Sequence, residues 1–179
     1  VSDIPNIWDS GSLARDLPHG TYTFEGFNDA KTSTLAALGW GLGAYRFDKY
    51  KNPLTLKTRL QWPSACDRKI VEQTLEAIFL VRDLINTPAE DMGPSELEKA
   101  ARTLANKFQA KIRVIKGKQL LAKNYPAIHA IGRASDDEPR LLDITWGKPT
   151  HPKITLIGKG VCFDTGGLDI KPASGMKLM

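Results

Sequence analysis

The residues of this sequence best suited to chemistry are two lysines and an aspartate near its C-terminal end. Lys159 and Asp164 lie in a glycine-rich stretch, GKGVCFDTGG over residues 158–167, and Lys171 follows it closely. The stretch comes directly after an apolar run, residues 154–157, which predicts a buried strand. Enzymes built on α/β sheets place active-site groups on the loops after such strands. Because Lys159 and Asp164 flank apolar residues at the end of a core strand, we expect neither charge to be fully solvated.

On its own, the glycine-rich stretch has three interpretations. The simplest is a tight corner between a strand and a loop, with its charges directed outward. The second is a phosphate-binding loop, although the spacing matches neither G-x-x-x-x-G-K-[ST] nor G-x-G-x-x-G. The third is a divalent-cation site, with Asp164 as an oxygen ligand and a lysine in its neutral form. An ammonium has no lone pair, so a ligating lysine must first lose its proton, which burial and the cation itself favour.

Three stretches of the sequence, taken together, carry a family resemblance. The first is the glycine-rich stretch, continued through LDIKP and ending in MKLM at residues 176–179. The others are LGAYRFDKYK over residues 42–51 and VRDLINTPA over residues 81–89. In this order they resemble the leucyl (cytosol) aminopeptidases, the two-metal M17 peptidases, and the resemblance covers roughly residues 35–179.

The resemblance implies roles for four residues, all of which would also contact the substrate. Lys159 is similar to a lysine that ligates one of two metal ions, and Asp164 to a carboxylate that ligates both. Lys171 is similar to a catalytic lysine that polarises the peptide carbonyl. Met179 is similar to a methionine that lines the pocket for the first side chain, where a flexible thioether suits leucine-like groups.

The resemblance also implies the reaction and the partners. Two divalent ions, Mn²⁺ or Zn²⁺ with Mg²⁺ or Co²⁺ as alternatives, would hold between them a hydroxide that attacks the scissile carbonyl. The ions would also bind the free α-amine, so the enzyme would remove leucine-like residues from the N-terminus of peptides. Family members form hexamers, which implies a homohexamer. The family's other metal ligands come after the position of Met179, so we expect these 179 residues to belong to a longer chain and to be inactive alone.

The composition and the missing motifs exclude several other classes. The chain is 41% hydrophobic and 25% charged, as in ordinary globular proteins, and contains neither a membrane-length apolar stretch nor a signal peptide. Its basic residues are interspersed with acidic ones, so the net charge of +5 predicts no nucleic-acid partner. Cys66 and Cys162 form no CxxC pair, which favours a reducing, cytoplasmic location. H-E-x-x-H and G-x-S-x-G are both absent, which argues against a zincin helix and a serine-hydrolase elbow.

The alternation of helical and strand patterns predicts an α/β fold in two parts. We expect the C-terminal part of a small α/β domain over residues 1–63 and a linker helix within residues 64–90. Residues 91–179 would then be the start of an α/β catalytic domain, whose mostly parallel or mixed sheet is covered by helices.

The N-terminal part is expected to contain two strands and a helix. Residues 21–25 and 54–62 alternate as half-buried strands do, and apolar residues recur at helical spacing from Leu35 to Tyr45. Three glycines weaken this helix, and we expect them to allow close packing against a neighbour; they are Gly39, Gly41 and Gly43.

The linker helix is predicted over residues 66–86, where Ser64 and Asp67 have the spacing of a capping box. Its apolar stripe consists of Val71, Leu75, Ile78, Val81 and Ile85. We expect Arg82 and Asp83 on this helix to be packing or solvated charges rather than functional ones.

A second helix is predicted over residues 95–109, where Ser95 and Glu98 again have capping-box spacing. Strands are predicted at residues 112–115, 141–146 and 154–157. Two functions of different classes fit the whole pattern. One is a metal-dependent exopeptidase, and the alternative is a non-catalytic fragment or binding module that retains the front half of the fold.

Overall fold

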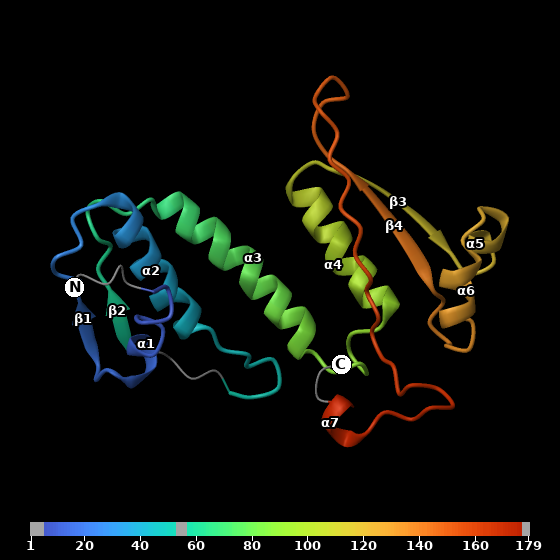
Figure 1. Cartoon of the computed structure of the whole chain (residues 1–179), viewed down its shortest axis with the longest axis horizontal. Helices are drawn as coiled ribbons and strands as arrows, with labels where there is room; N and C mark the ends of the chain where they lie inside the picture. The colour runs from blue at the N-terminus through green and yellow to red at the C-terminus, as the bar shows by residue number, and fades with distance from the viewer. Residues whose placement is uncertain (1–5, 53–56, 177–179) are drawn as a thin grey trace. The chain divides into compact units, whose positions relative to one another are not determined.

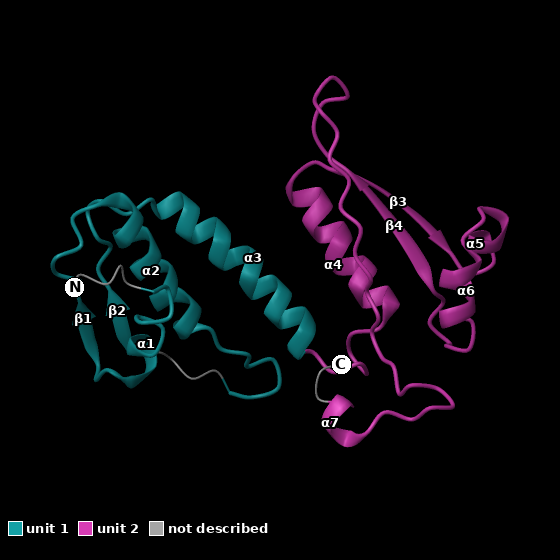
Figure 2. Ribbon diagram, in the orientation of Figure 1, with its two compact units in different colours: residues 1–86 teal, residues 87–179 magenta. Residues whose placement is uncertain are grey.

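The structure is a computed structural model that describes residues 6–52 and 57–176. The chain divides into two compact units, residues 1–86 and residues 87–179 (Figure 2). Within these described residues, each unit has helices and one two-stranded sheet, so the predicted α/β class is confirmed. The predicted domain boundaries at residues 63/64 and 90/91 stay predictions.

The described residues of the first unit form three helices and two short strands (Figure 1). In chain order they are α1 (Leu13–Asp16), β1 (Gly20–Tyr22), α2 (Ala30–Ala44), β2 (Thr58–Leu60) and α3 (Arg68–Asn86). The strands pair in parallel, with Gly20 opposite Thr58 and Tyr22 opposite Leu60. They lie within or beside the predicted strands 21–25 and 54–62, but residues 53–56 fall outside the described part of the chain.

The core of the first unit lies between α2 and α3. Its buried members are Ala37, Leu38, Leu42 and Val71, and the half-buried Leu75 and Ile78 pack against them. Most of the two predicted apolar stripes is thereby confirmed. Val81 and Ile85 are exceptions, with exposed fractions of 52% and 70%. After Ile78, the next residue of α3 that contacts α2 is Arg82, which bonds to Leu42. Val81 lies beside that face and stays exposed.

The glycines of α2 allow its backbone to approach other chain segments closely. A methyl group on Gly43 would lie 1.5 Å from the carbonyl oxygen of Gly11, and one on Gly39 would lie 1.9 Å from that of Ile7. On Gly41 it would meet the side chain of Leu75 at 2.3 Å. The predicted reason for these glycines, close packing, is therefore confirmed.

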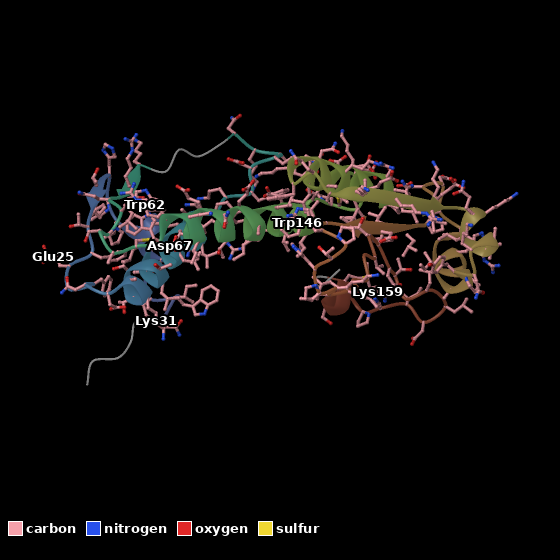
Figure 3. The ribbon with its side chains drawn as sticks, turned by 90° about the horizontal axis from the view of Figure 1, so that it is seen from above. Glu25, Lys31, Trp62, Asp67, Trp146 and Lys159 are labelled. Carbon is pink, nitrogen blue, oxygen red and sulfur yellow. The ribbon has the colours of Figure 1, made fainter. Side chains whose placement is uncertain are left out.

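The start of α3 is capped by Asp67, which is labelled in Figure 3. Its Oδ1 accepts a hydrogen bond from the backbone N–H of Ile70 at 3.0 Å, as an N-cap side chain does. The capping box predicted from Ser64 is wrong, because the helix begins one turn later than that spacing requires, at Arg68.

We expect Asp67→Ala to destabilise α3 by about 1 kcal/mol, the usual effect of removing an N-cap oxygen. Ser64→Ala should change the free energy of unfolding much less, since Ser64 precedes the cap. Denaturant unfolding of the two variants tests this. Equal losses for both would mean that Asp67 is not the cap.

Arg82 and Asp83 hold α3 against the end of α2. Arg82 Nη1 donates to the carbonyl oxygen of Leu42 at 3.0 Å, and its guanidinium lies over the ring of Tyr45, 5.1 Å from the centroid. The Tyr45 hydroxyl donates to Asp83 Oδ1 at 2.8 Å and accepts from the Asn86 amide at 3.0 Å. These contacts support packing roles for both charges. They also join the stretches 42–51 and 81–89, which are far apart in sequence.

In the second unit, residues 87–176 form four helices and two strands (Figure 1). They are α4 (Pro94–Lys107), β3 (Lys111–Lys116), α5 (Gln119–Ala122), α6 (Pro126–Gly132), β4 (Arg140–Thr145) and α7 (Ala173–Met176). β3 and β4 pair antiparallel, with Lys111 opposite Thr145 and Lys116 opposite Arg140. Helices α4, α5 and α6 contact this pair. The predicted helix at 95–109 and strands at 112–115 and 141–146 are thus confirmed, apart from their ends.

The strand predicted at residues 154–157 is not formed. These residues have no regular secondary structure and pair with no strand in the part of the chain that the structure describes. Ile154, Leu156 and Ile157 have exposed fractions of 85%, 91% and 96%. A strand needs neighbours for its backbone N–H and C=O groups, and apolar content alone does not supply them.

The capping box predicted from Ser95 and Glu98 is also wrong. The N-cap of α4 is Gly93, which has no side chain to cap with. A residue far away in sequence caps the first turn instead. Asp137 Oδ2 accepts a hydrogen bond from the backbone N–H of Ser95 at 2.7 Å and another from its hydroxyl at 2.9 Å. Glu98 pairs with two arginines, Arg102 and Arg140. Local spacing could not reveal a cap that lies 42 residues away.

Candidate functional site

The loop between Asp164 and Lys171 is shaped by two glycines. Gly166 and Gly167 have positive φ angles of 93° and 66°, which residues with a side chain rarely adopt. A methyl group on Gly166 would also lie 2.1 Å from the carbonyl oxygen of Asp169. The turn is closed by a 2.7 Å hydrogen bond from the Lys171 N–H to the Thr165 carbonyl. It therefore returns Lys171 to the neighbourhood of Asp164.

Asp164 and Lys171 form an ion pair. The Lys171 Nζ lies 2.9 Å from Asp164 Oδ2, and the Gly166 N–H donates to Asp164 Oδ1 at 2.7 Å. The side chains are 43% exposed for Asp164 and 31% for Lys171. Two of the predicted site residues are thus in direct contact and partly open to solvent.

These donors keep Asp164 ionised. The hydrogen bond from Lys171 lowers the pKa of the Asp164 carboxyl below its ordinary value of 3.8, and the Gly166 N–H lowers it further. The charges of Lys171 and Lys159 act in the same direction. Since the shift is downward, Asp164 is a carboxylate at every pH above its ordinary value, which is the form that can bind a cation.

Lys159, labelled in Figure 3, is exposed on the extended segment after residue 157. The expectation that this charge is shielded from solvent is wrong. It depended on a core strand at residues 154–157, which does not form among the described residues. Lys159 is still close enough to Asp164 to affect its ionisation. Met179, the fourth predicted site residue, lies outside the described residues.

Asp164 and Lys159 have atoms that could supply part of the ligand set of a metal ion. Each oxygen of Asp164 accepts one hydrogen bond and keeps a lone pair, and carboxylate oxygen is a preferred ligand of hard divalent cations. A neutral Lys159 would add a nitrogen donor. Within residues 6–52 and 57–176, no three His, Cys, Asp or Glu side chains lie together as a metal site would need. Among the described residues, Asp164 and Lys159 therefore fit as two ligands of a metal ion.

A second charged cluster was not identified from the sequence. Arg140 lies between Glu98 and Asp137 with only 10% of its side chain exposed. Its Nη1 lies 2.6 Å from Glu98 Oε2, and its Nη2 donates to Asp137 Oδ1. The residues come from α4, the loop before β4 and β4 itself, so no local pattern indicates them.

No helix in the described part of the chain is both long enough and apolar enough to cross a membrane.

Two family profiles match the chain. The catalytic domain of the cytosol aminopeptidase family matches residues 79–179. The N-terminal domain of the M17 aminopeptidases matches residues 1–63. The residues discussed for the site therefore all fall in the part that resembles the catalytic domain.

Individual proteins resemble the chain over most of its length. A probable cytosol aminopeptidase of Aeropyrum pernix is 33% identical over 154 residues, which are 84% of this chain and 31% of that protein. The crystal structure of a cytosol aminopeptidase from Coxiella burnetii matches with 48% identity and a TM-score of 0.91, covering 100% of this chain and 39% of that one. The bottromycin maturation enzyme BotP in complex with Mn matches with 30% identity and a TM-score of 0.76, at coverages of 96% and 40%. The chain thus spans less than half the length of each.

Proposed function

The chain belongs to the cytosol aminopeptidase family, and we propose that the complete protein is a metal-dependent aminopeptidase. The observation that carries the proposal is the ion pair of Asp164 and Lys171 on a glycine-shaped loop, within the part matched by the catalytic-domain profile. A carboxylate held in its ionised form beside an ammonium can bind a cation on one side and a polarised carbonyl on the other. No finding favours the alternative of a non-catalytic binding module.

Asp164 and Lys159 are the proposed metal ligands. Asp164 is kept ionised by Lys171 and the Gly166 N–H, and Lys159 lies close enough to influence it. A pair of divalent ions, when bound, supplies Lewis-acid activation of water and of the peptide carbonyl. The relative BotP is described as a complex with Mn, which supports Mn²⁺ as the first ion to test. Zn²⁺ is the second, followed by Mg²⁺ and Co²⁺.

Lys171 is the proposed catalytic residue. Its ammonium is held in place by Asp164 and remains 31% exposed, so it can donate a hydrogen bond to the oxygen of the scissile carbonyl. The stabilisation from this hydrogen bond increases as negative charge develops on that oxygen during attack by water. Met179 would line the pocket for the first side chain, which suits leucine-like residues.

The proposed substrates are peptides with a free N-terminus, since binding of the free amine is what makes such an enzyme an exopeptidase. We propose a cytoplasmic location, because relatives are described as cytosol aminopeptidases, and a homohexameric assembly. The proposed domain division remains residues 1–63, a linker helix within 64–90, and a catalytic domain beginning near residue 91.

Metal binding by Asp164→Asn tests the proposal. The amide keeps the shape of the side chain but loses its charge, so the affinity for Mn²⁺ should fall by about a hundredfold or more. The measurement is a Mn²⁺ titration of the metal-free complete protein. Asp169→Asn, a change at an aspartate on the exposed side of the same loop, is the matched control. Unchanged affinity in Asp164→Asn would exclude this residue as a ligand.

A further inference from the structure

Arg140 connects three segments of the second unit. Its guanidinium pairs with Glu98 of α4 at 2.6 Å and with Asp137, and its Nε donates to the carbonyl oxygen of Glu138 at 3.0 Å. Asp137 in turn caps the first turn of α4 through Ser95. Arg140 and Glu98 are only 10% and 15% exposed, so this network fixes the N-terminal end of α4 against β4.

The segment that carries the proposed ligands lies on this end of α4. A methyl group on Gly160 would come within 2.9 Å of Leu97, so the two residues are in close contact. Cys162, two residues further along the chain, is half-buried; this burial raises the pKa of its thiol, while the charge of Arg140 lowers it.

Burial alternates along this segment. Cys162, Asp164 and Gly166 are partly buried, whereas the odd-numbered residues between them are exposed. Gly160 is the point of contact with α4; Lys159 directly precedes it, and Asp164 follows Cys162 after one residue.

We propose that Arg140 and Asp137 are positioning residues that hold the Gly160–Cys162 segment on α4 and thereby place Lys159 and Asp164 for metal binding. The inference rests on the proposed function, because it assigns these two residues to the proposed metal site. Neither residue is a proposed ligand, and both act through the first turns of α4. Two groups separated by four residues along a flexible chain become a fixed pair of donors only when the segment between them is anchored.

The experiment uses variants of the complete protein. Arg140→Met removes the charge and both carboxylate contacts. Arg140→Lys keeps the charge, but a single ammonium cannot reproduce the planar fork that reaches Glu98 and Asp137 together. Arg102→Met is the matched control, because Arg102 pairs with the same Glu98 at 2.7 Å but is 47% exposed and takes no part in capping α4. Thermal unfolding identifies the variants that remain folded.

Two quantities are measured. The first is the rate at which iodoacetamide alkylates Cys162 in the metal-free protein, followed by mass spectrometry of the peptide that contains it. Removing a neighbouring cation does not by itself make a thiol more reactive, so faster alkylation indicates exposure. The second is the affinity for Mn²⁺, from the electron paramagnetic resonance signal of the free ion.

For Arg140→Met, we expect alkylation to become about tenfold faster and the Mn²⁺ affinity to fall by about 10- to 100-fold. Arg140→Lys should lie between this variant and wild type, and Arg102→Met should stay within about twofold of wild type. The inference is overturned if a folded Arg140→Met stays within twofold in either quantity, or if Arg102→Met changes as much. If Arg140→Met does not fold, Arg140→Lys and Asp137→Asn are judged by the same criteria.

The two proposals can fail separately. If wild type binds Mn²⁺ and hydrolyses leucine amide while the Arg140 variants behave like wild type, only the positioning role is rejected. If wild type binds no Mn²⁺, the proposed function is rejected, and the positioning of metal ligands is rejected with it, whatever the alkylation rates show.

Discussion

Lys171→Ala should reduce kcat for leucine amide by about 10²–10³-fold, the usual effect of removing one donor that stabilises a developing oxyanion. The Mn²⁺ affinity should be retained. Lys171 donates to Asp164 and is not a proposed ligand, and removing a cation next to Asp164 leaves its carboxylate free to bind another. A large loss of kcat at unchanged metal affinity would therefore separate a catalytic role from a structural one. The comparison uses steady-state kinetics at saturating Mn²⁺.

Lys153→Ala is the matched control for this variant, since Lys153 is an exposed lysine on the loop that precedes residues 154–157. It should leave kcat unchanged. Undiminished turnover in Lys171→Ala would reject the assignment of this residue. A parallel loss of Mn²⁺ affinity would instead make it a residue that organises Asp164.

Gly43→Ala should be the most destabilising of the alanine substitutions at the glycines of α2. The added methyl group would lie 1.5 Å from the Gly11 carbonyl oxygen, and a backbone atom cannot rotate out of the way. Overpacking of this kind typically lowers the free energy of unfolding by about 1–3 kcal/mol or more. The higher helix propensity of alanine offsets about 1 kcal/mol of this loss. Because the clash is with backbone, we take the upper end of this range and expect a net loss of about 2 kcal/mol, which corresponds to roughly a thirtyfold loss of hydrogen-exchange protection in α2.

Gly41→Ala tests the reason for this effect. Its methyl group would meet the side chain of Leu75, which can change rotamer, so the loss should be smaller. Hydrogen exchange of the α2 peptides in both variants gives the comparison. Equal protection in Gly43→Ala and wild type would mean that α2 and the Gly11 segment do not approach each other as described.

The elements that could be predicted from sequence are those whose signal is local. The helices near residues 66–86 and 95–109 and the strands near 112–115 and 141–146 carry clear periodic patterns, and they form. Residues 154–157 carry an apolar pattern of equal strength but form no strand, because pairing depends on other segments. The prediction of the α4 cap was wrong for the same reason, because the capping residue Asp137 lies 42 residues from Ser95.

The candidate site was predictable to the same extent. Asp164 and Lys171 were candidates by residue type and resemblance, but their spacing did not predict the ion pair between them, which depends on the turn at Gly166 and Gly167. The exposure of Lys159 was not predictable, because it follows from the missing strand partners of the preceding residues. The Arg140 cluster was not found, since its members come from three separate segments. The roles of Lys159, Asp164, Lys171 and Met179 in metal binding and catalysis stay predictions.

The most direct test of the central claim is the hydrolysis of two substrates, leucine amide and N-acetyl-leucine amide, by the complete protein. Each is assayed after metal removal and again after Mn²⁺ or Zn²⁺ is returned. A metal-dependent aminopeptidase should cleave only leucine amide, and only with the metal present, because the acetyl group removes the free amine that must be bound. Equal cleavage of both substrates, or full activity in the metal-free protein, would contradict the account.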